Sequence, residues 1–258
     1  MSSALIGYTG FVGGNLDAQH EFDDKYNTKN IDDIDGKEYD LVVSAATYAE
    51  MWKINQDPEG DLAQVNGLIA HLKNVKAKRF VLISTVGVYK NSIGADEDSP
   101  IELDGLPPYG VNRYHLENFV RENFPGALIV RLPGLFGKGL KKNVIFDLLN
   151  DNNVDRIHYA GSYQYYNLAN LWKDIQVGLD NNLELLNLAT APVRTDELAD
   201  YAFGIKDFKT EPEGFTPAKW DMRSKHANLF GGADGYLYSK QQSLDEIKNF
   251  VADQQGAA

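Results

Sequence analysis

The chain contains no cysteine, which excludes disulfide bridges, thiolate metal sites and a cysteine nucleophile. Positive charge is also scarce: the chain has 25 lysines and arginines but 37 aspartates and glutamates, which gives a formal net charge of −12. This balance argues against non-specific binding to nucleic acid or to an anionic membrane surface. An anionic ligand would therefore need a local cluster of donors. The five histidines show no ligand spacing, so we predict no metal site.

Long apolar runs are missing as well. The first run, Ala4-Leu5-Ile6, is short, and nothing in the sequence predicts a signal peptide or a membrane span. With 258 residues, 43% of them apolar, the chain is long enough for one α/β domain with a modest appendage. These features predict a cytoplasmic enzyme or binding protein.

Three glycines, Gly7, Gly10 and Gly13, directly follow the first apolar run. At a strand-to-helix junction, the first allows a sharp turn, the second lets a pyrophosphate approach the backbone, and the third lets the helix pack on the strand. The amide dipoles at the start of that helix favour a phosphate. The spacing Gly-x-x-Gly-x-x-Gly alone is also compatible with a glycine-rich turn that binds nothing.

Short apolar runs alternate with amphipathic stretches through the first half, which predicts a parallel sheet with crossover helices. The expected strands are 4–8, one ending at 25–27, 41–45, 80–84 and 128–131. The expected helices are 13–20, one with Leu62, Val65, Ile69 and Leu72 on one face, 110–124, 168–181, 195–203 and 243–253. The acidic stretch 90–108 should be a loop. We predict an α/β fold: a Rossmann-type doubly wound parallel sheet in a single domain, 1–258, with a small C-terminal substrate-binding cap mainly from about 134–258.

Two further motifs carry a resemblance to a known family. One is the strand 81–89, which ends in Ser84 and Thr85 and then Val-Tyr; the other is 108–117, with Tyr-x-x-x-Arg followed by Glu. Further matches are the strand 40–46, Asn66, the turn 131–137 and the segment 164–169. Over roughly residues 4–205 the chain resembles the extended short-chain dehydrogenase/reductase family of NAD(P)-dependent nucleotide-sugar epimerases, dehydratases and reductases.

The resemblance implies that Tyr109 is the acid/base, that Thr85 orients the substrate hydroxyl and that Arg113 activates the tyrosine. A cation beside a phenol stabilises the phenolate, which general acid/base catalysis near neutral pH requires. The family has lysine where this chain has Arg113. Arginine keeps the charge but effectively never gives up its proton, so electrostatic activation can survive this change and a proton relay cannot. A second hypothesis is therefore a non-catalytic regulatory protein on the same fold that binds a dinucleotide or a nucleotide sugar.

The resemblance also implies an NAD or NADP site. The cofactor-binding residues expected are Gly7, Thr9, Gly10, Phe11, Val12, Gly13, Asn27, Lys29, Ala45, Ala46, Asn66, Tyr109, Arg113 and Pro133. An NAD enzyme places a carboxylate at the end of the second strand, where this chain has Asn27 with Lys29 close by. This leans slightly to NADP, although Lys29 is equally well a solvated turn lysine.

The expected substrate is a small-molecule nucleotide sugar. No nucleic acid or membrane partner is expected, and a homodimer is compatible with the sequence. Substrate-binding residues are expected in the basic loop after the turn 131–137 and in the segment 164–169; they are Lys138, Lys141, Lys142, Asn143, Gln164 and Tyr166. The alternative to substrate binding is that the lysines form a solvated basic turn and that the tyrosine packs in the core. The family's dehydratases follow the threonine with Asp-Glu, whereas Val86 and Gly87 follow Thr85, so a reductase or an epimerase is predicted.

Overall fold

The computed structural model describes residues 2–256. The chain divides into two compact units. The first contains Met1–Asn91, Asp98–Leu132 and Ala169–Asn187, and the second contains Ser92–Glu97, Pro133–Leu168 and Leu188–Ala258. No helix between residues 2 and 256 combines the length and the apolar character needed to cross a membrane.

The first unit is built on a six-stranded sheet of order β2-β1-β3-β4-β5-β9 in which every pair is parallel. Its strands are β1 (Ser3–Ile6), β2 (Asp24–Tyr26), β3 (Glu38–Ser44), β4 (Lys76–Thr85), β5 (Leu128–Leu132) and β9 (Leu185–Asn187). The strand order reverses at β1, with β2 on one side and β3 on the other. A ligand crevice in such sheets lies at the carboxyl ends of the strands beside that reversal.

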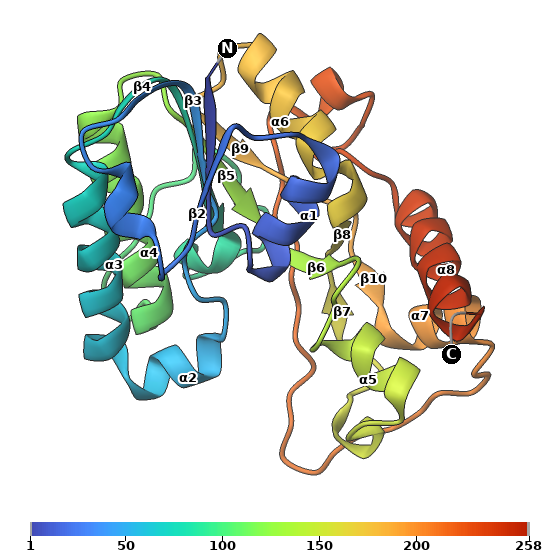
Figure 1. Ribbon diagram of the computed structural model, residues 1–258. Helices are drawn as coiled ribbons and strands as arrows, with labels where there is room; N and C mark the ends of the chain where they lie inside the picture. Colours follow the sequence, from blue (N-terminus) through green and yellow to red (C-terminus); the bar gives the residue numbers. More distant parts are fainter. Residues whose placement is uncertain (1, 257–258) are drawn as a thin grey trace. The chain divides into compact units, whose positions relative to one another are not determined.

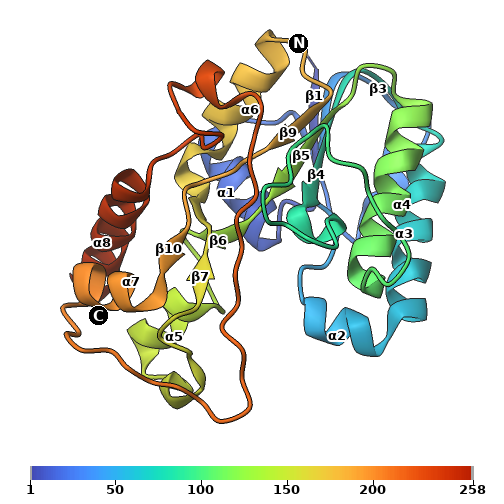
Figure 2. The same cartoon turned by 180° about the vertical axis from the view of Figure 1, so that it is seen from behind.

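Helices cover both faces of this sheet (Figures 1 and 2). α1 (Phe11–Gln19) and α6 (Leu171–Asp180) lie on one face, and α3 (Pro58–Leu72) and α4 (Pro108–Asn123) lie on the other. The short α2 (Met51–Gln56) precedes α3. α3 begins where the Asp57 side chain accepts a hydrogen bond from the Gly60 N–H and Pro58 occupies the first turn, a favoured helix start.

The second unit contains smaller elements. β6 (Gly134–Phe136) pairs with β8 (Tyr165–Asn167), and β7 (Ser162–Tyr163) pairs with β10 (Val193–Arg194). Its helices are α5 (Val144–Asn150), α7 (Thr195–Phe203) and α8 (Lys240–Gly256). Phe136, Ile145, Leu198 and Ile247 lie fully buried in its core, and α7 ends at Gly204 in the left-handed conformation.

The predicted α/β doubly wound parallel sheet is confirmed, and four local expectations are corrected. The first helix begins at Phe11, not Gly13. α2 and α5 lie in stretches where no helix was expected, because both are too short to show a helical period. Leu62 is exposed, since the buried face of α3 is formed by Asp61, Val65, Ile69 and Leu72.

Candidate functional site

The glycine loop between β1 and α1 is held together by its own backbone. Gly7 has φ +88°, and a Cβ there would lie 2.5 Å from the Ala45 carbonyl oxygen. A Cβ on Gly13 would lie 2.1 Å from the Gly7 carbonyl oxygen. The chain's own packing therefore requires glycine at both positions.

Gly10 is a glycine under a different constraint. It is exposed, it is the N-cap of α1, and its Cβ would meet only the Gly7 carbonyl oxygen at 3.3 Å. No side chain of the described residues caps the helix here, and the first turn, Phe11–Gly14, is uncharged. Amide groups at an uncapped helix start attract an anion. The loop thus fits a pyrophosphate, and a methyl group on Gly10 would occupy the approach to it.

The other expected residues of this region surround the loop in different ways. Thr9 is exposed, while Phe11 and Val12 are half-buried. The Ala45 N–H donates to the Ile6 carbonyl oxygen at 2.8 Å, which brings the end of β3 beside the end of β1. Ala46 follows and lines a pocket on the neighbouring α3.

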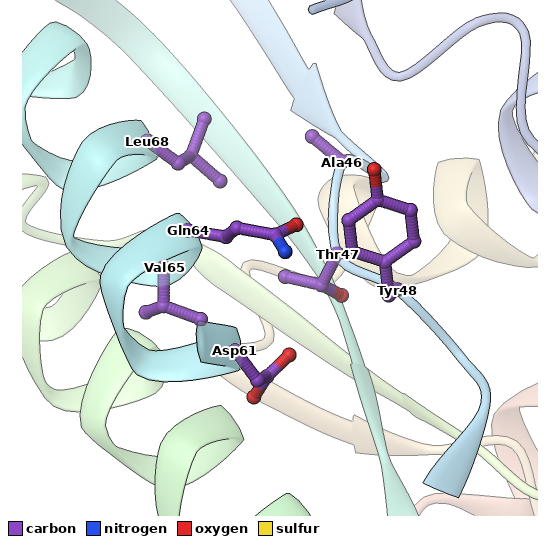
Figure 3. Close-up of a pocket in the computed structure, with 7 residues that line it drawn as sticks. All are labelled: Ala46, Thr47, Tyr48, Asp61, Gln64, Val65 and Leu68. Carbon is purple, nitrogen blue, oxygen red and sulfur yellow. The ribbon is translucent and has the colours of Figure 1, made fainter. Parts of the chain in front are cut away.

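That pocket is formed between the segment after β3 and α3 (Figure 3). Its lining residues are Ala46, Thr47, Tyr48, Asp61, Gln64, Val65 and Leu68. Figure 3 shows the Gln64 amide and the Asp61 carboxylate on α3, opposite the segment 46–48. An adjoining hollow of about 190 Å³ shares three of these residues and extends to α2. The sequence analysis missed Asp61 and Gln64, although a polar residue in line with Val65 and Ile69 is a visible signal.

Tyr109 and Thr85 both lie next to the backbone of Gly87. A Cβ on Gly87 would lie 2.9 Å from Tyr109 Cε1 and 3.3 Å from Thr85 Oγ1. Thr85 Oγ1 accepts a hydrogen bond from the Gly87 N–H at 3.0 Å, and the Tyr109 N–H donates to Asn55 Oδ1 on α2 at 3.0 Å. The structure therefore brings the predicted acid/base and the predicted orienting hydroxyl together at the end of β4.

Arg113 lies one turn along α4 from Tyr109 and is held by a partner that the sequence did not suggest. Its Nη1 and Nη2 donate to the two oxygens of Asp61 at 2.9 and 2.8 Å, and Nη2 also donates to the Tyr48 carbonyl oxygen at 2.7 Å. The guanidinium carbon lies 4.9 Å from the centre of the Tyr109 ring. The expected contact of Arg113 with Tyr109 is present, but the positive charge belongs to a buried ion pair.

A second buried ion pair fixes α4 to the sheet. Glu117 accepts from Ser84 Oγ at 2.5 Å and from the Arg131 guanidinium at 3.0 and 2.6 Å. Arg131 Nη1 also donates to the Tyr89 hydroxyl at 2.7 Å. Burial alone would lower the pKa of Arg131, but Glu117 and Tyr89 raise it above its ordinary value. The motif residues Ser84, Glu117 and Arg131 thus position the helix that carries Tyr109.

Three further residues expected to bind the cofactor, Asn27, Lys29 and Asn66, lie on two separate elements. Asn27 follows β2, and its Oδ1 accepts from the Lys29 N–H at 2.8 Å in a turn where Lys29 is exposed. Asn66 is exposed on α3, and its Oδ1 lies 3.0 Å from His115 Nε2 on α4. Asn66 therefore faces away from the row formed by Asp61, Gln64 and Leu68 that lines the pocket.

Three residues of the second unit that were expected to bind substrate have side chains that already make contacts within the chain. Gln164 Nε2 donates to the carbonyl oxygens of Thr190 and Met222, and its Oε1 accepts from the Met222 N–H. Tyr166 is fully buried with its ring edge-on to Tyr238. Asn143 caps α5 by accepting from the Phe146 N–H and donating to the Leu135 carbonyl oxygen. These side chains are engaged within the chain, so their role in substrate binding stays a prediction and the proposed site does not depend on them.

The basic loop and Pro133 also lie in the second unit. Pro133 is half-buried directly after β5, and Lys138, Lys141 and Lys142 are exposed before α5. Within residues 2–256, no group of three or more histidines and carboxylates is arranged to hold a metal ion.

Comparison with known proteins identifies the fold. No family profile and no curated protein match the chain. A dTDP-4-dehydrorhamnose reductase from Clostridium acetobutylicum shares 17% identity with a TM-score of 0.73 over 99% of this chain and 100% of that one. An NAD-dependent NDP-hexosamine 5,6-dehydratase of tunicamycin biosynthesis shares 15% at 0.74 over 98% of both. UDP-glucose 4-epimerase from Thermotoga maritima, solved with UDP-glucose, shares 17% at 0.67 over 99% and 100%. The chain has the fold of these nucleotide-sugar enzymes.

Proposed function

We propose that this chain is an NAD(P)-dependent oxidoreductase or epimerase of the extended short-chain dehydrogenase/reductase type that acts on a nucleotide-activated sugar. The observation that carries the proposal is the pairing, within one unit, of an open glycine loop at Gly10 with Tyr109 and Thr85 at the end of β4. Similarity in fold to a reductase, a dehydratase and an epimerase supports it.

In this proposal the loop residues Gly7–Gly13 hold the cofactor pyrophosphate, and Ala45 and Ala46 border it. The bound nicotinamide supplies or accepts the hydride. Tyr109 gives the proton to the substrate oxygen or takes it, and Thr85 orients that oxygen with its hydroxyl. Arg113 packs its guanidinium against the Tyr109 ring, where it holds the ring in place.

Asn27 and the exposed Lys29 favour NADP. Asn27 offers an amide in place of the carboxylate that would accept from a ribose 2′-hydroxyl, and an exposed ammonium can bind a 2′-phosphate as a point charge. For the substrate, Lys138, Lys141 and Lys142 offer the positive charge that a sugar-nucleotide pyrophosphate requires. A reductase or an epimerase is favoured over a dehydratase because Val86 and Gly87 provide no carboxylate after Thr85.

One observation favours a second candidate, a protein that binds a dinucleotide or a nucleotide sugar with little turnover. Asp61 holds both terminal nitrogens of Arg113, so the residue in the position of the family's lysine brings no net charge to Tyr109. Cofactor binding by the glycine loop does not depend on that charge.

Binding at the loop is tested with two single-methyl variants. Gly10→Ala places a methyl group where the pyrophosphate would approach, whereas Gly14→Ala adds one at an exposed position 3.4 Å from the Tyr8 carbonyl oxygen. We expect NADPH to raise the melting temperature of the wild type and of Gly14→Ala, and Gly10→Ala to lose at least tenfold in NADPH affinity by calorimetry. Equal affinities in all three proteins would contradict a phosphate site at this loop.

Turnover separates the two candidates. Absorbance at 340 nm is followed with NAD or NADP and UDP-glucose, and with a panel of other nucleotide sugars in both redox directions. Because an epimerase returns its cofactor to the starting redox state, the nucleotide sugar is also analysed by chromatography after incubation. Net nicotinamide reduction or oxidation, or conversion of the sugar into its epimer, supports an enzyme. Tight dinucleotide binding with neither change across the panel favours the binding protein.

A further inference from the structure

Asp61 is a nearly buried carboxylate with an unusual set of partners. It is 5% exposed, and it accepts from Asn112 Nδ2 at 2.9 Å and from both terminal nitrogens of Arg113. Arg113 is 2% exposed, and its Nε has no hydrogen-bond partner among residues 2–256. A bidentate pair of this kind fixes the orientation of the guanidinium as well as its charge.

We infer that Asp61 is a positioning residue that cancels the charge of Arg113 beside Tyr109 and thereby restrains proton transfer at this site. The inference rests on the proposed function, in which Tyr109 is the acid/base. A lone cation over the ring of a phenol stabilises the phenolate, but a cation held against a carboxylate acts only as a weaker dipole.

The other charged groups near the pair do not replace the charge that Asp61 cancels. The hollow beside Asp61 also contains Glu50, Lys53 and Asp57. Lys53 Nζ lies 2.8 Å from Glu50 Oε2, so these two charges compensate each other. Asp57 caps α3 through the Gly60 N–H, and Tyr48 contacts Arg113 through its backbone carbonyl. Arg113 is therefore the cation that faces the Tyr109 ring, and Asp61 is the anion that faces Arg113.

It follows that Asp61 and Arg113 act as one unit. Replacing Arg113 by lysine alone leaves Asp61 in place, and the new ammonium would pair with it. Removing the carboxylate while a cation remains is what should expose Tyr109 to positive charge. Asp61→Asn makes that change at constant size, and the asparagine oxygen can still accept from Arg113.

The test reads the Tyr109 phenol directly, without cofactor or substrate. Absorbance at 295 nm is titrated with pH for each protein and for the same protein carrying Tyr109→Phe, and the difference isolates Tyr109. We expect the midpoint of this difference to move to lower pH by about one unit in Asp61→Asn. Asp57→Asn is the matched control, since it removes a carboxylate from the same hollow that does not contact Arg113, and its midpoint should stay that of the wild type.

Breaking a buried ion pair can destabilise the fold, so circular dichroism first establishes that each variant is folded. If Asp61→Asn is not, Asp61→Asn with Arg113→Lys is compared with Arg113→Lys alone, and the same acid shift is expected. An unchanged midpoint in a folded variant without the Asp61 charge, or an equal shift in Asp57→Asn, would overturn the inference.

NADPH affinity is measured on the same proteins to keep the two proposals apart. A shifted midpoint in a protein that binds no NADPH supports the charge pairing and contradicts the proposed function. NADPH binding with an unchanged midpoint supports the proposed function and contradicts the charge pairing. Where turnover is found, the double variant should exceed Arg113→Lys by about tenfold at neutral pH.

Discussion

The glycine loop and the Tyr109–Arg113 face of α4 match the same family pattern, but they match it in different ways. The loop is defined by backbone alone, since a Cβ on Gly7 or Gly13 would overlap backbone atoms, whereas a Cβ on Gly10 would meet a single carbonyl oxygen, that of Gly7, at 3.3 Å. The α4 face is defined by side chains, and its chemistry depends on Asp61, which lies 52 residues before Arg113 in the sequence. The conformation of the loop follows from local backbone requirements, whereas the α4 face depends on the residues that the rest of the fold places beside it.

The largest expected effect would break the loop itself. Gly13→Ala puts a Cβ 2.1 Å from the Gly7 carbonyl oxygen, a contact that only a backbone shift can relieve. We expect the free energy of unfolding to fall by about 3 kcal/mol or more in chemical denaturation. Gly10→Ala, with its nearest atom at 3.3 Å, should lose less than about 1 kcal/mol. Equal losses would show that the two glycines are under the same constraint.

The next effect separates catalysis on α4 from binding at the loop. Tyr109→Phe keeps the ring against Gly87 but removes the proton donor. If turnover is found, it should fall by about 100-fold or more, while calorimetric NADPH affinity stays within about twofold of the wild type. Full activity in this variant would mean that the proton chemistry lies elsewhere.

The smallest expected effect concerns Lys29, at the edge of the proposed cofactor site. Lys29→Ala should weaken NADPH binding by about 1 kcal/mol, close to fivefold, because an exposed lysine–phosphate contact is screened by solvent and salt. NADH affinity should not change. A wild-type preference for NADH of tenfold or more would reverse the lean to NADP and leave Lys29 as a solvated turn residue.

The same contrast between backbone and side chains explains what the sequence could predict. Alternating apolar runs and glycine spacing predict the parallel sheet and the tight glycine turn after β1, because both follow from local backbone requirements. The sequence did not predict the role of Asp61, because its partner Arg113 is on another helix. An ion pair between two helices produces no pattern in the local residue spacing. Gln164 shows the same limit for a polar side chain in a motif: the sequence does not reveal that it donates hydrogen bonds to the buried carbonyl groups of Thr190 and Met222.

The C-terminal end of α1, the helix whose N-terminus we propose binds phosphate, contacts a tryptophan. The His20 ring, at the C-cap of α1, stacks on Trp172 of α6 with centroids 4.0 Å apart, and Phe22 meets both rings edge-on. Burial lowers the pKa of His20, although Asp23 and Glu21 act to raise it. The lowered pKa favours the neutral imidazole in this stack. A nine-residue helix spans roughly 14 Å, so a ligand bound at the N-terminus of α1 would lie about one helix length from the stack of His20 on Trp172, one of the three tryptophans of the chain.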